Sequence, residues 1–418
     1  MVQPVRAVAA LVLTSLALAA CSTGEGAAGA GEARTVVIAS ELPLQGAAKD
    51  TSEATSNAMK LYLEQVGDKA GRHTVKLQQY DNSTGASGQW DAATCRYNAQ
   101  AHLAAGAEVA VVGPFDTGCA QVMLPVLNGA GGPVLTVSHA ATSPGLTREW
   151  APGEPAKYFP SGRRAFARVV TTDERQGAAA AQFAAQKLGA TRVQLLHDGQ
   201  DYGRGVARAF AAEARRQGLV VVGNTGWDPR RRDYSVLFKG IRRAAPDLVF
   251  LAGTYENNGA RLIEDKVAVL GDNDTVNLMG SDGFAGYPPL LDLPQAEGMY
   301  ITFPGLAMEQ LRQAGGTPAR LLVDYRARHG ADLTSSYALY GVAALQVVLD
   351  AVARSDGTRQ GVLDALFTGE GVTIPAERSA TGQEIRIDPR TGDVAGRDTS
   401  VLVVRDGVEV FVQAQPVG

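Results

Sequence analysis

Short apolar runs rich in β-branched residues alternate along the chain with longer, alanine-rich amphipathic stretches. The first set of runs predicts strands at 36–39, 75–80, 109–112 and 134–137, separated by helices at 54–66, 90–105 and 119–128. Continuous apolar strands that alternate with helices are typical of a parallel sheet covered on both faces. We therefore predict that this part of the chain forms a doubly wound α/β unit.

The same rhythm then repeats. The second set predicts strands at 167–171, 193–196, 220–222, 248–251 and 276–279, with helices at 176–188, 205–217, 234–243 and 259–270. After a strand at 299–302 the pattern is mostly helical, at 321–329, 336–353 and 361–367. Strands at 401–404 and 408–412 flank Arg405-Asp406-Gly407, a two-residue hairpin signal.

These two sets of elements predict two lobes. Because no long linker separates them, we expect the chain to cross between the lobes several times. The expected boundaries place 35–170 and 304–384 in the first lobe, and 171–303 and 385–418 in the second.

The start of the chain predicts an export signal. Arg6 precedes an uncharged, mostly apolar stretch of fourteen residues at 7–20, which suits a signal peptide and is too short to span a bilayer. Leu18-Ala19-Ala20-Cys21 resembles a bacterial lipobox, which implies cleavage after residue 20 and lipidation of Cys21. An ordinary secretory peptide cut near Ala20 is the alternative. Residues 22–34 are small and polar, as in a flexible tether.

Charge and cysteine content narrow the function classes. The net charge of −4 and the absence of a basic stripe argue against nucleic-acid binding. Cys95 and Cys119 are the two cysteines besides Cys21, and in an oxidising compartment such a pair usually bonds. The five histidines have no metal-ligand spacing, so we expect neither a metal nor a cofactor.

Candidate binding residues follow the predicted strands, because ligands of doubly wound sheets bind beyond the carboxyl ends of the strands. The first lobe supplies Phe115, Asp116 and Thr117 after one strand, and Ser138, His139, Ala140 and Thr142 after another; the second supplies Tyr202, Tyr255 and Asp282. Hydroxyls and amides at a helix start suit a carboxylate, whereas tyrosines and an acid suit an apolar body and an ammonium. Together they predict a pocket for a zwitterion with a hydrophobic side chain.

Several fragments, in their order and spacing, resemble the solute-binding proteins of branched-chain amino acid ABC transporters. The fragments are Leu44-Gln45-Gly46, Tyr80-Asp81, Val112-Gly113-Pro114, Thr142-Ser143-Pro144-Gly145-Leu146-Thr147, Asp173 with Gln176-Gly177, His197-Asp198 with Tyr202-Gly203, and Gly280-Ser281-Asp282-Gly283. The resemblance runs from Val36 to the C-terminus. It implies the bilobed fold of type I periplasmic binding proteins.

The resemblance also implies roles for individual residues. Thr117, Ala140 and Thr142 match the groups that bind the ligand carboxylate, Tyr202 and Tyr255 match aromatic residues that close over the ligand, Asp282 matches the acid that pairs with the α-ammonium, and Cys95 and Cys119 fall near the family's disulfide. Purely structural roles are the alternatives: a helix cap for Thr117 or Asp282, and packing between lobes for the tyrosines.

Four positions depart from the family pattern. His139 stands where proline is frequent, and Thr51 where an aromatic side chain often lines the pocket. Asp282 is one methylene shorter than the usual glutamate. Asp116 lies beside the expected carboxylate site, where it would repel the ligand unless it points away. These departures put the identity of the ligand in doubt.

The sequence thus predicts an extracytoplasmic lipoprotein, anchored to the outer face of the cell membrane, that passes a branched-chain or similar amino acid to ABC permease subunits. It predicts no catalysis. Phe115-Asp116-Thr117-Gly118 resembles the aspartic protease motif, but that chemistry needs a second Asp-Thr-Gly, which the chain lacks. The alternative function is a sensing module that binds amides, urea or small organic acids and signals to a membrane receptor.

Overall fold

The computed structural model describes residues 32–129, 131–396 and 399–415. The predicted signal peptide, Cys21 and nearly all of the predicted tether lie outside the described residues. The chain from Ala33 onward forms one compact unit, which contains two sheets of parallel-dominated strands with helices packed against them. The predicted α/β class with two doubly wound lobes is therefore confirmed.

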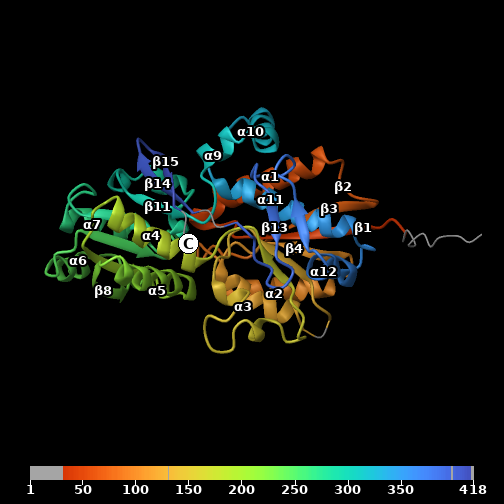
Figure 1. Cartoon of the computed structure of the whole chain (residues 1–418), viewed down its shortest axis with the longest axis horizontal. Helices are drawn as coiled ribbons and strands as arrows, with labels where there is room; N and C mark the ends of the chain where they lie inside the picture. Colours follow the sequence, from red (N-terminus) through yellow and green to blue (C-terminus); the bar gives the residue numbers. More distant parts are fainter. Residues whose placement is uncertain (1–31, 130, 397–398, 416–418) are drawn as a thin grey trace, which may run out of the picture. The chain divides into compact units, whose positions relative to one another are not determined.

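The first lobe is built on a six-stranded sheet (Figure 1). Its order is β2 (Lys69–Ala70), β3 (His73–Asp81), β1 (Thr35–Leu42), β4 (Glu108–Val112), β5 (Leu135–Ser138) and β6 (Phe166–Arg168). All neighbours are parallel except β2, which pairs antiparallel with β3. The carboxyl ends of β1, β4 and β5 therefore meet at one edge of the sheet.

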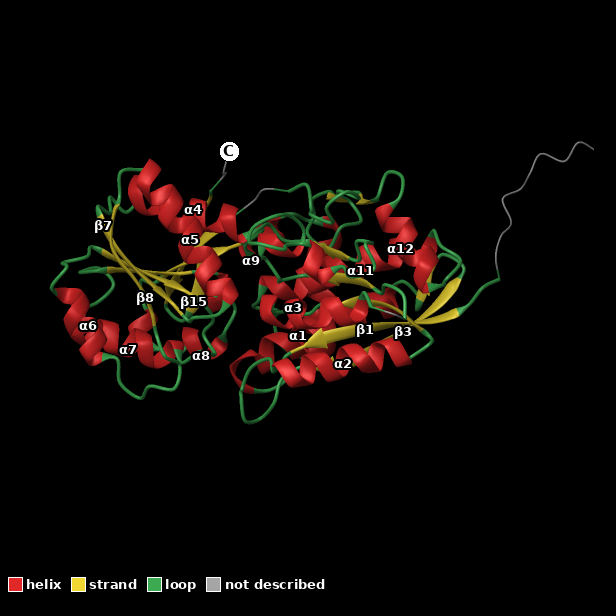
Figure 2. Cartoon of the chain, turned by 90° about the horizontal axis from the view of Figure 1, so that it is seen from below, coloured by secondary structure: helices red, strands yellow, loops and turns green. Residues whose placement is uncertain are grey.

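Helices cover both faces of this sheet (Figures 1 and 2). They are α1 (Lys49–Gln65), α2 (Ala92–Ala104), α3 (Thr117–Leu127), α11 (Ser336–Ala353) and α12 (Arg359–Phe367). Helix α10 (Gly316–His329) packs outside α1, and α9 (Met308–Gln313) contacts α10 and β15. On one face α1 packs on α11, and on the other α2 packs on α3. A disulfide joins Cys95 of α2 to Cys119 of α3, as predicted.

Helix α11 is the one helix, among the described residues, that is long and apolar enough to cross a membrane. Its side chains are nearly all buried, because it packs against α1, α12 and the strands β4 and β5. Such burial is what the central helix of a lobe requires.

The second lobe is built on a seven-stranded sheet. Its order is β15 (Val408–Ala414), β14 (Ser400–Arg405), β11 (Tyr300–Phe303), β10 (Asn277–Gly280), β9 (Leu248–Ala252), β7 (Arg192–His197) and β8 (Val220–Gly226). The strands from β11 to β8 are parallel, whereas β14 and β15 are antiparallel to their neighbours. The helices are α4 (Asp173–Gln186), α5 (Asp201–Arg216), α6 (Ser235–Arg242), α7 (Gly259–Leu270) and α8 (Pro288–Leu291).

The predicted hairpin at the end of the chain is present. Strands β14 and β15 face each other with Arg405 opposite Val408, so Asp406 and Gly407 form the two-residue turn. Both turn residues have positive φ, 50° and 73°, as a type I′ turn requires.

Two details of chain assignment differ from the prediction. The strand predicted at 167–171 to open the second set is β6, and it pairs with β5 in the first sheet. A linear pattern of strands does not say which sheet a boundary strand joins. In addition, a small two-stranded sheet, β12 (Val372–Ile374) with β13 (Ile385–Ile387), spans the expected boundary at 384/385. Asp393, further along, pairs with Arg168 of β6 at 2.8 Å.

Candidate functional site

Asp282 is a buried acid held by groups from both lobes. It follows β10 and is 3% exposed. Its Oδ1 accepts hydrogen bonds from the Tyr202 hydroxyl and from Gln176 Nε2, and its Oδ2 accepts one from the Tyr337 hydroxyl at 2.5 Å. Burial raises the pKa of Asp282, and these three donors oppose that rise. Because Tyr337 begins α11 of the first lobe, this carboxylate links the two lobes.

Aromatic rings surround the first-lobe side of this contact. The Phe115 ring lies 4.9 Å from the Tyr337 ring and 5.6 Å from the His139 ring, measured between centroids, and both contacts are edge-on. His139 is fully buried, and neither ring nitrogen has a hydrogen-bond partner among the described residues. Burial lowers the pKa of His139 to about 3, so the ring is neutral.

The two first-lobe loops expected to bind a carboxylate are largely bonded within themselves. The Ser138 hydroxyl donates to the Pro114 carbonyl at 2.7 Å and accepts from the amides of Ala140 and Ala141. The Thr117 hydroxyl accepts from the Ser143 amide at 3.4 Å. These bonds tie the β4–α3 loop to the loop after β5, and they place Thr117 beside Thr142.

Thr142 and Asp173 extend the site toward the second lobe. The Asp173 amide donates to the Thr142 carbonyl at 3.1 Å. Burial raises the pKa of the Asp173 carboxyl to about 8, while the Thr142 hydroxyl opposes the rise. Asp173 and Gln176 lie on the first turn of α4, the first helix of the second lobe.

Asp116 does not point away from the site. Its Oδ2 is buried without a hydrogen-bond partner among the described residues. Burial, followed by the carboxylates of Glu256, Asp198 and Asp282, raises the pKa of Asp116 well above its usual range. Asp116 precedes α3 in the first lobe, and the three other acids follow strands of the second lobe. The carboxyl ends of the two sheets therefore present acids to each other.

Tyr255 lies in the second-lobe wall. Its ring centroid is 5.4 Å from that of Tyr287, whose hydroxyl donates to Glu256 Oε1 at 2.7 Å. The Tyr255 amide donates to the Gly283 carbonyl at 2.8 Å. A Cβ at Gly283 would overlap the Gly253 carbonyl, so glycine permits the close approach of the segment carrying Asp282 to the β9–α7 loop.

The model of the periplasmic binding protein family matches residues 35–407, which include every residue of the site and all strands of the two sheets except β15. The chain belongs to this family.

Relatives of this periplasmic binding protein include a Leu/Ile/Val/Thr-binding protein of Salmonella typhimurium, 28% identical over 173 residues. They also include the Leu/Ile/Val-binding protein BraC3 of Rhizobium johnstonii, 29% identical over 177 residues. The alignments cover 41% and 42% of this chain and 43% of each relative, so they span less than half the length of either protein. These relatives are binding proteins, not enzymes.

Solved structures agree with the fold over nearly the whole length of the chain. A leucine-binding protein from Thermotoga maritima has a TM-score of 0.73 at 20% identity, covering 91% of this chain and 99% of its own. A solute-binding protein from Rhodopseudomonas palustris in complex with p-hydroxybenzoic acid has a TM-score of 0.74 at 17% identity, covering 91% and 98%. At these identities the likeness establishes the fold.

In this periplasmic binding protein the residues predicted from the sequence lie in two neighbouring walls. Phe115, Asp116, Thr117, Ser138, His139, Ala140 and Thr142 form one wall, and Tyr202, Tyr255 and Asp282 form the other. Six further residues of the site were not predicted as site residues: Asp173, Gln176, Asp198, Glu256, Tyr287 and Tyr337. The sequence could have indicated four of them. Glu256 lies beside the predicted site residue Tyr255, and Asp173, Gln176 and Asp198 belong to family motifs. No sequence signal indicates Tyr337 or Tyr287 as a site residue, because both lie away from the strand ends.

The described residues contain no group of three or more His, Cys, Asp or Glu side chains arranged to hold a metal ion. The acids near Asp116 therefore do not form a metal-ligand cluster.

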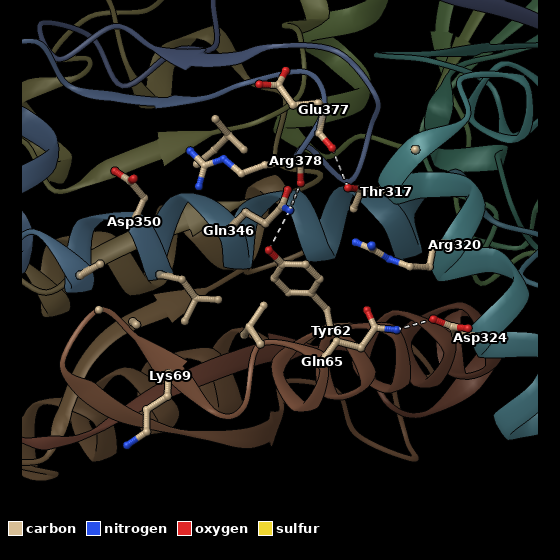
Figure 3. A pocket seen from close by; sticks show the side chains of 17 residues that line it. Tyr62, Gln65, Lys69, Thr317, Arg320, Asp324, Gln346, Asp350, Glu377 and Arg378 are labelled. Carbon is tan, nitrogen blue, oxygen red and sulfur yellow. Dashed lines mark hydrogen bonds between the residues drawn. The ribbon is translucent and has the colours of Figure 1, made fainter.

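A separate cavity of about 880 Å³ lies between α1, α10 and α11 in the first lobe (Figure 3). Polar side chains bridge its walls: Gln346 donates to the Tyr62 hydroxyl at 3.0 Å, and Gln65 donates to Asp324 at 2.7 Å. None of the predicted site residues lines it. It is thus distinct from the candidate site.

Proposed function

We propose that this protein is an extracytoplasmic solute-binding protein that captures an amino acid between its lobes and delivers it to an ABC permease. The membership of the family supports the binding role. The observation that carries the proposal is Asp282, a buried carboxylate that receives hydrogen bonds from Tyr202 and Gln176 of one lobe and Tyr337 of the other.

In the proposed mechanism Asp282 pairs with the α-ammonium of the ligand. Tyr202 and Tyr255 cover the ligand from the second lobe, and the aromatic side chain of Phe115 covers it from the first. Thr117, Ala140 and Thr142 face the α-carboxylate, at the N-terminus of α3, where the helix dipole favours negative charge. Because the same ligand contacts both lobes, binding favours the closed arrangement.

The names of the relatives guide the choice of ligands to test. The Salmonella and Rhizobium relatives are named for leucine, isoleucine and valine, and one solved neighbour holds p-hydroxybenzoic acid. Charge favours an amino compound over an organic acid here, because the raised pKa values of Asp116, Asp282 and Glu256 would be lowered by a cation and raised further by a benzoate. We propose a branched-chain or similar amino acid as the ligand class.

The test is calorimetric titration of the purified protein with amino acids and with benzoates. We expect Asp282→Asn to weaken amino acid binding at least tenfold, since it removes the charge that pairs with the ammonium. Asp274→Asn removes an exposed acid before β10, at the opposite edge of the same sheet, and serves as the control. Unchanged affinity in Asp282→Asn, or binding of benzoates alone, would show that the assignment is wrong.

We also propose that Cys21 is lipidated and that residues 22–34 tether the lobes to the outer face of the membrane. The lobe boundaries remain a proposal. We place the last crossing of the chain from the first lobe to the second after Asp393, because Asp393 pairs with Arg168 of the first sheet. Cys21→Ala, expressed in a bacterium that processes lipoproteins, is expected to move the protein from the membrane fraction to the soluble extracytoplasmic fraction. Retention in the membrane would contradict lipidation.

A further inference from the structure

Besides the two oxygens of Asp173, which lie beside the Thr142 hydroxyl, two carboxylate oxygens in the candidate site lack a donor. Asp116 Oδ2 and Glu256 Oε2 are buried, and neither has a hydrogen-bond partner among the described residues. Asp116 precedes α3 in the first lobe, and Glu256 lies in the β9–α7 segment of the second. The two acids belong to one group, because Glu256 is the charge that most affects Asp116.

Two neighbouring acids, Asp282 and Asp198, are satisfied by the protein itself. Asp282 has three donors, as described above. Asp198 accepts from the amides of Gln200 and Thr254 and from Asn257 Nδ2, at 3.0, 3.1 and 2.9 Å. Asp116 Oδ2 and Glu256 Oε2, by contrast, stay without a donor, although the Tyr287 hydroxyl donates to Glu256 Oε1. No lysine or arginine of the described chain forms an ion pair with either.

A third buried acceptor in the site also lacks a donor. Gln176 is fully buried, its Nε2 donates to Asp282, and its Oε1 has no partner among the described residues. A buried acceptor without a donor is costly, so it marks a place where a ligand N–H would be stabilising. The site thus offers open acceptors at both Asp282 and the Asp116–Glu256 pair.

The groups expected to bind an anion are, in contrast, partly occupied, although Thr142 Oγ1 is buried without a partner among the described residues. The Ala140 amide bonds to Ser138 Oγ, and Thr117 Oγ1 accepts from the Ser143 amide. Asp116, Glu256 and Gln176 each leave one acceptor oxygen open in the site. An uncharged branched-chain side chain would leave Asp116 and Glu256 buried without a partner, which is strongly unfavourable.

We infer that the ligand carries a second cationic nitrogen, an ammonium or guanidinium, which binds between Asp116 Oδ2 and Glu256 Oε2 while its α-ammonium pairs with Asp282. This inference rests on the proposed function and narrows its ligand to a basic amino acid. One carboxylate comes from each lobe, so the distal cation joins the lobes as the α-ammonium does. Tyr255 and Tyr287 supply aromatic faces beside it.

The experiment compares three pairs of ligands that differ in the distal cation. The purified protein is titrated with lysine and norleucine, ornithine and norvaline, and arginine and citrulline. We expect one of the cationic members to bind at least tenfold more tightly than its neutral partner, the effect of a charge-assisted hydrogen bond. Leucine is titrated alongside as the test of the proposed function.

Variants locate the cation. We expect Asp116→Asn and Glu256→Gln each to weaken binding of the cationic ligand at least tenfold, so that its advantage over the neutral partner is lost. Asp274→Asn and Glu370→Gln, which replace exposed acids, are the matched controls and should change neither affinity. Thermal unfolding of each variant verifies that it is folded.

The outcomes separate the two claims. Tighter binding of leucine or of a neutral partner, with no loss in Asp116→Asn, would overturn the second cation site and leave the proposed function standing. Failure of every amino acid to bind the folded protein would overturn both. Loss of cationic binding in Asp274→Asn as well would show a long-range charge effect and would also overturn the site.

Discussion

At the scale of single residues, Asp116 and Glu256 illustrate how a binding site costs stability. Both carboxylates are partly buried, and each raises the energy of the other in the absence of a cation. We expect Asp116→Asn to stabilise the ligand-free protein by about 1–2 kcal/mol, because an amide replaces one of two like charges. Denaturant unfolding at pH 7.5 measures this, with Asp274→Asn as the control.

The pH dependence gives a second check on the same residue. A carboxyl whose folded pKa is raised loses stability as pH rises from its unfolded value, about 4, through the folded value. The wild type should therefore gain stability relative to Asp116→Asn as pH is lowered from 7.5 toward 5. If the difference in unfolding free energy between the variant and the wild type is the same at pH 7.5 and pH 5, the pKa of Asp116 is not raised.

His102 is a second residue whose environment makes a prediction. It is fully buried, with Nε2 2.8 Å from Glu41 Oε1 and Nδ1 2.6 Å from Glu108 Oε2. Burial alone would lower the pKa of His102, but the two glutamates overcome this and raise it to about 9. The stability that this gives is fully present below about pH 6.5 and is lost as pH rises through 9.

We expect His102→Gln to lose about 3–5 kcal/mol of unfolding free energy at pH 6, because it leaves two buried carboxylates without their cation. The difference from wild type should shrink between pH 7 and 10. Chemical denaturation at several pH values measures it, and His329→Gln, at the exposed end of α10, is the control. A loss that is constant with pH would show that His102 is neutral in the folded protein.

At the scale of elements, the alternation of strands and helices was predictable because each element carries its own period of apolar residues. The hairpin at Asp406-Gly407 was also predictable, because its signal lies in the turn residues themselves. The pairing of β6 and the ladder of β12 with β13 were not, because three-residue strands have no readable period and their partners lie far along the chain.

The same distinction applies to the candidate site. Asp116, Tyr202 and Asp282 follow predicted strands, so the rule that ligands bind beyond strand ends makes them candidates from the sequence alone. Tyr337 begins a helix that was predicted correctly, yet its hydrogen bond to Asp282 depends on how α11 packs across the first lobe. The sequence does not predict that Asp116 and Glu256 each have an oxygen without a donor. Each acid lies in an ordinary loop, and its surroundings depend on how the two sheets are placed.

The Cys95–Cys119 disulfide acts on the pair of helices α2 and α3. It closes a loop of 24 residues and lies in a buried cluster with Ala99 and Met123. We expect the double variant Cys95→Ala, Cys119→Ala to lose about 3 kcal/mol of stability, mainly because its unfolded chain is less constrained. Thermal unfolding with and without reductant measures the loss. The variant should be insensitive to reductant, and equal reductant sensitivity in both proteins would contradict the pairing.

At the scale of the whole molecule, the described contacts between lobes surround the site. Besides Tyr337 with Asp282, Trp90 Nε1 donates to Gln200 Oε1 at 3.3 Å, and the Thr51 hydroxyl donates to the Gly286 carbonyl at 2.5 Å. Thr51 begins α1 of the first lobe, and Gly286 follows the segment that carries Asp282. The two lobes are therefore in direct contact around the candidate site.

Thr51 and Thr55 allow this coupling to be tested on one helix. The Thr55 hydroxyl, one turn later, donates to the Thr51 carbonyl within the first lobe. Loss of one hydrogen bond costs about 0.5–1.5 kcal/mol. If closure contributes to affinity, Thr51→Val should weaken ligand binding about 2- to 10-fold.

We expect that weakening to arise mainly from faster dissociation, because the Thr51 bond forms in the closed state. Thr55→Val removes a hydroxyl of the same kind without touching the second lobe, so it should leave both rates unchanged. Stopped-flow measurement of association and dissociation distinguishes the variants. Equal effects of the two substitutions would mean that the Thr51–Gly286 bond stabilises α1 rather than the closed arrangement, and that closure is governed by the ligand contacts at Asp282 alone.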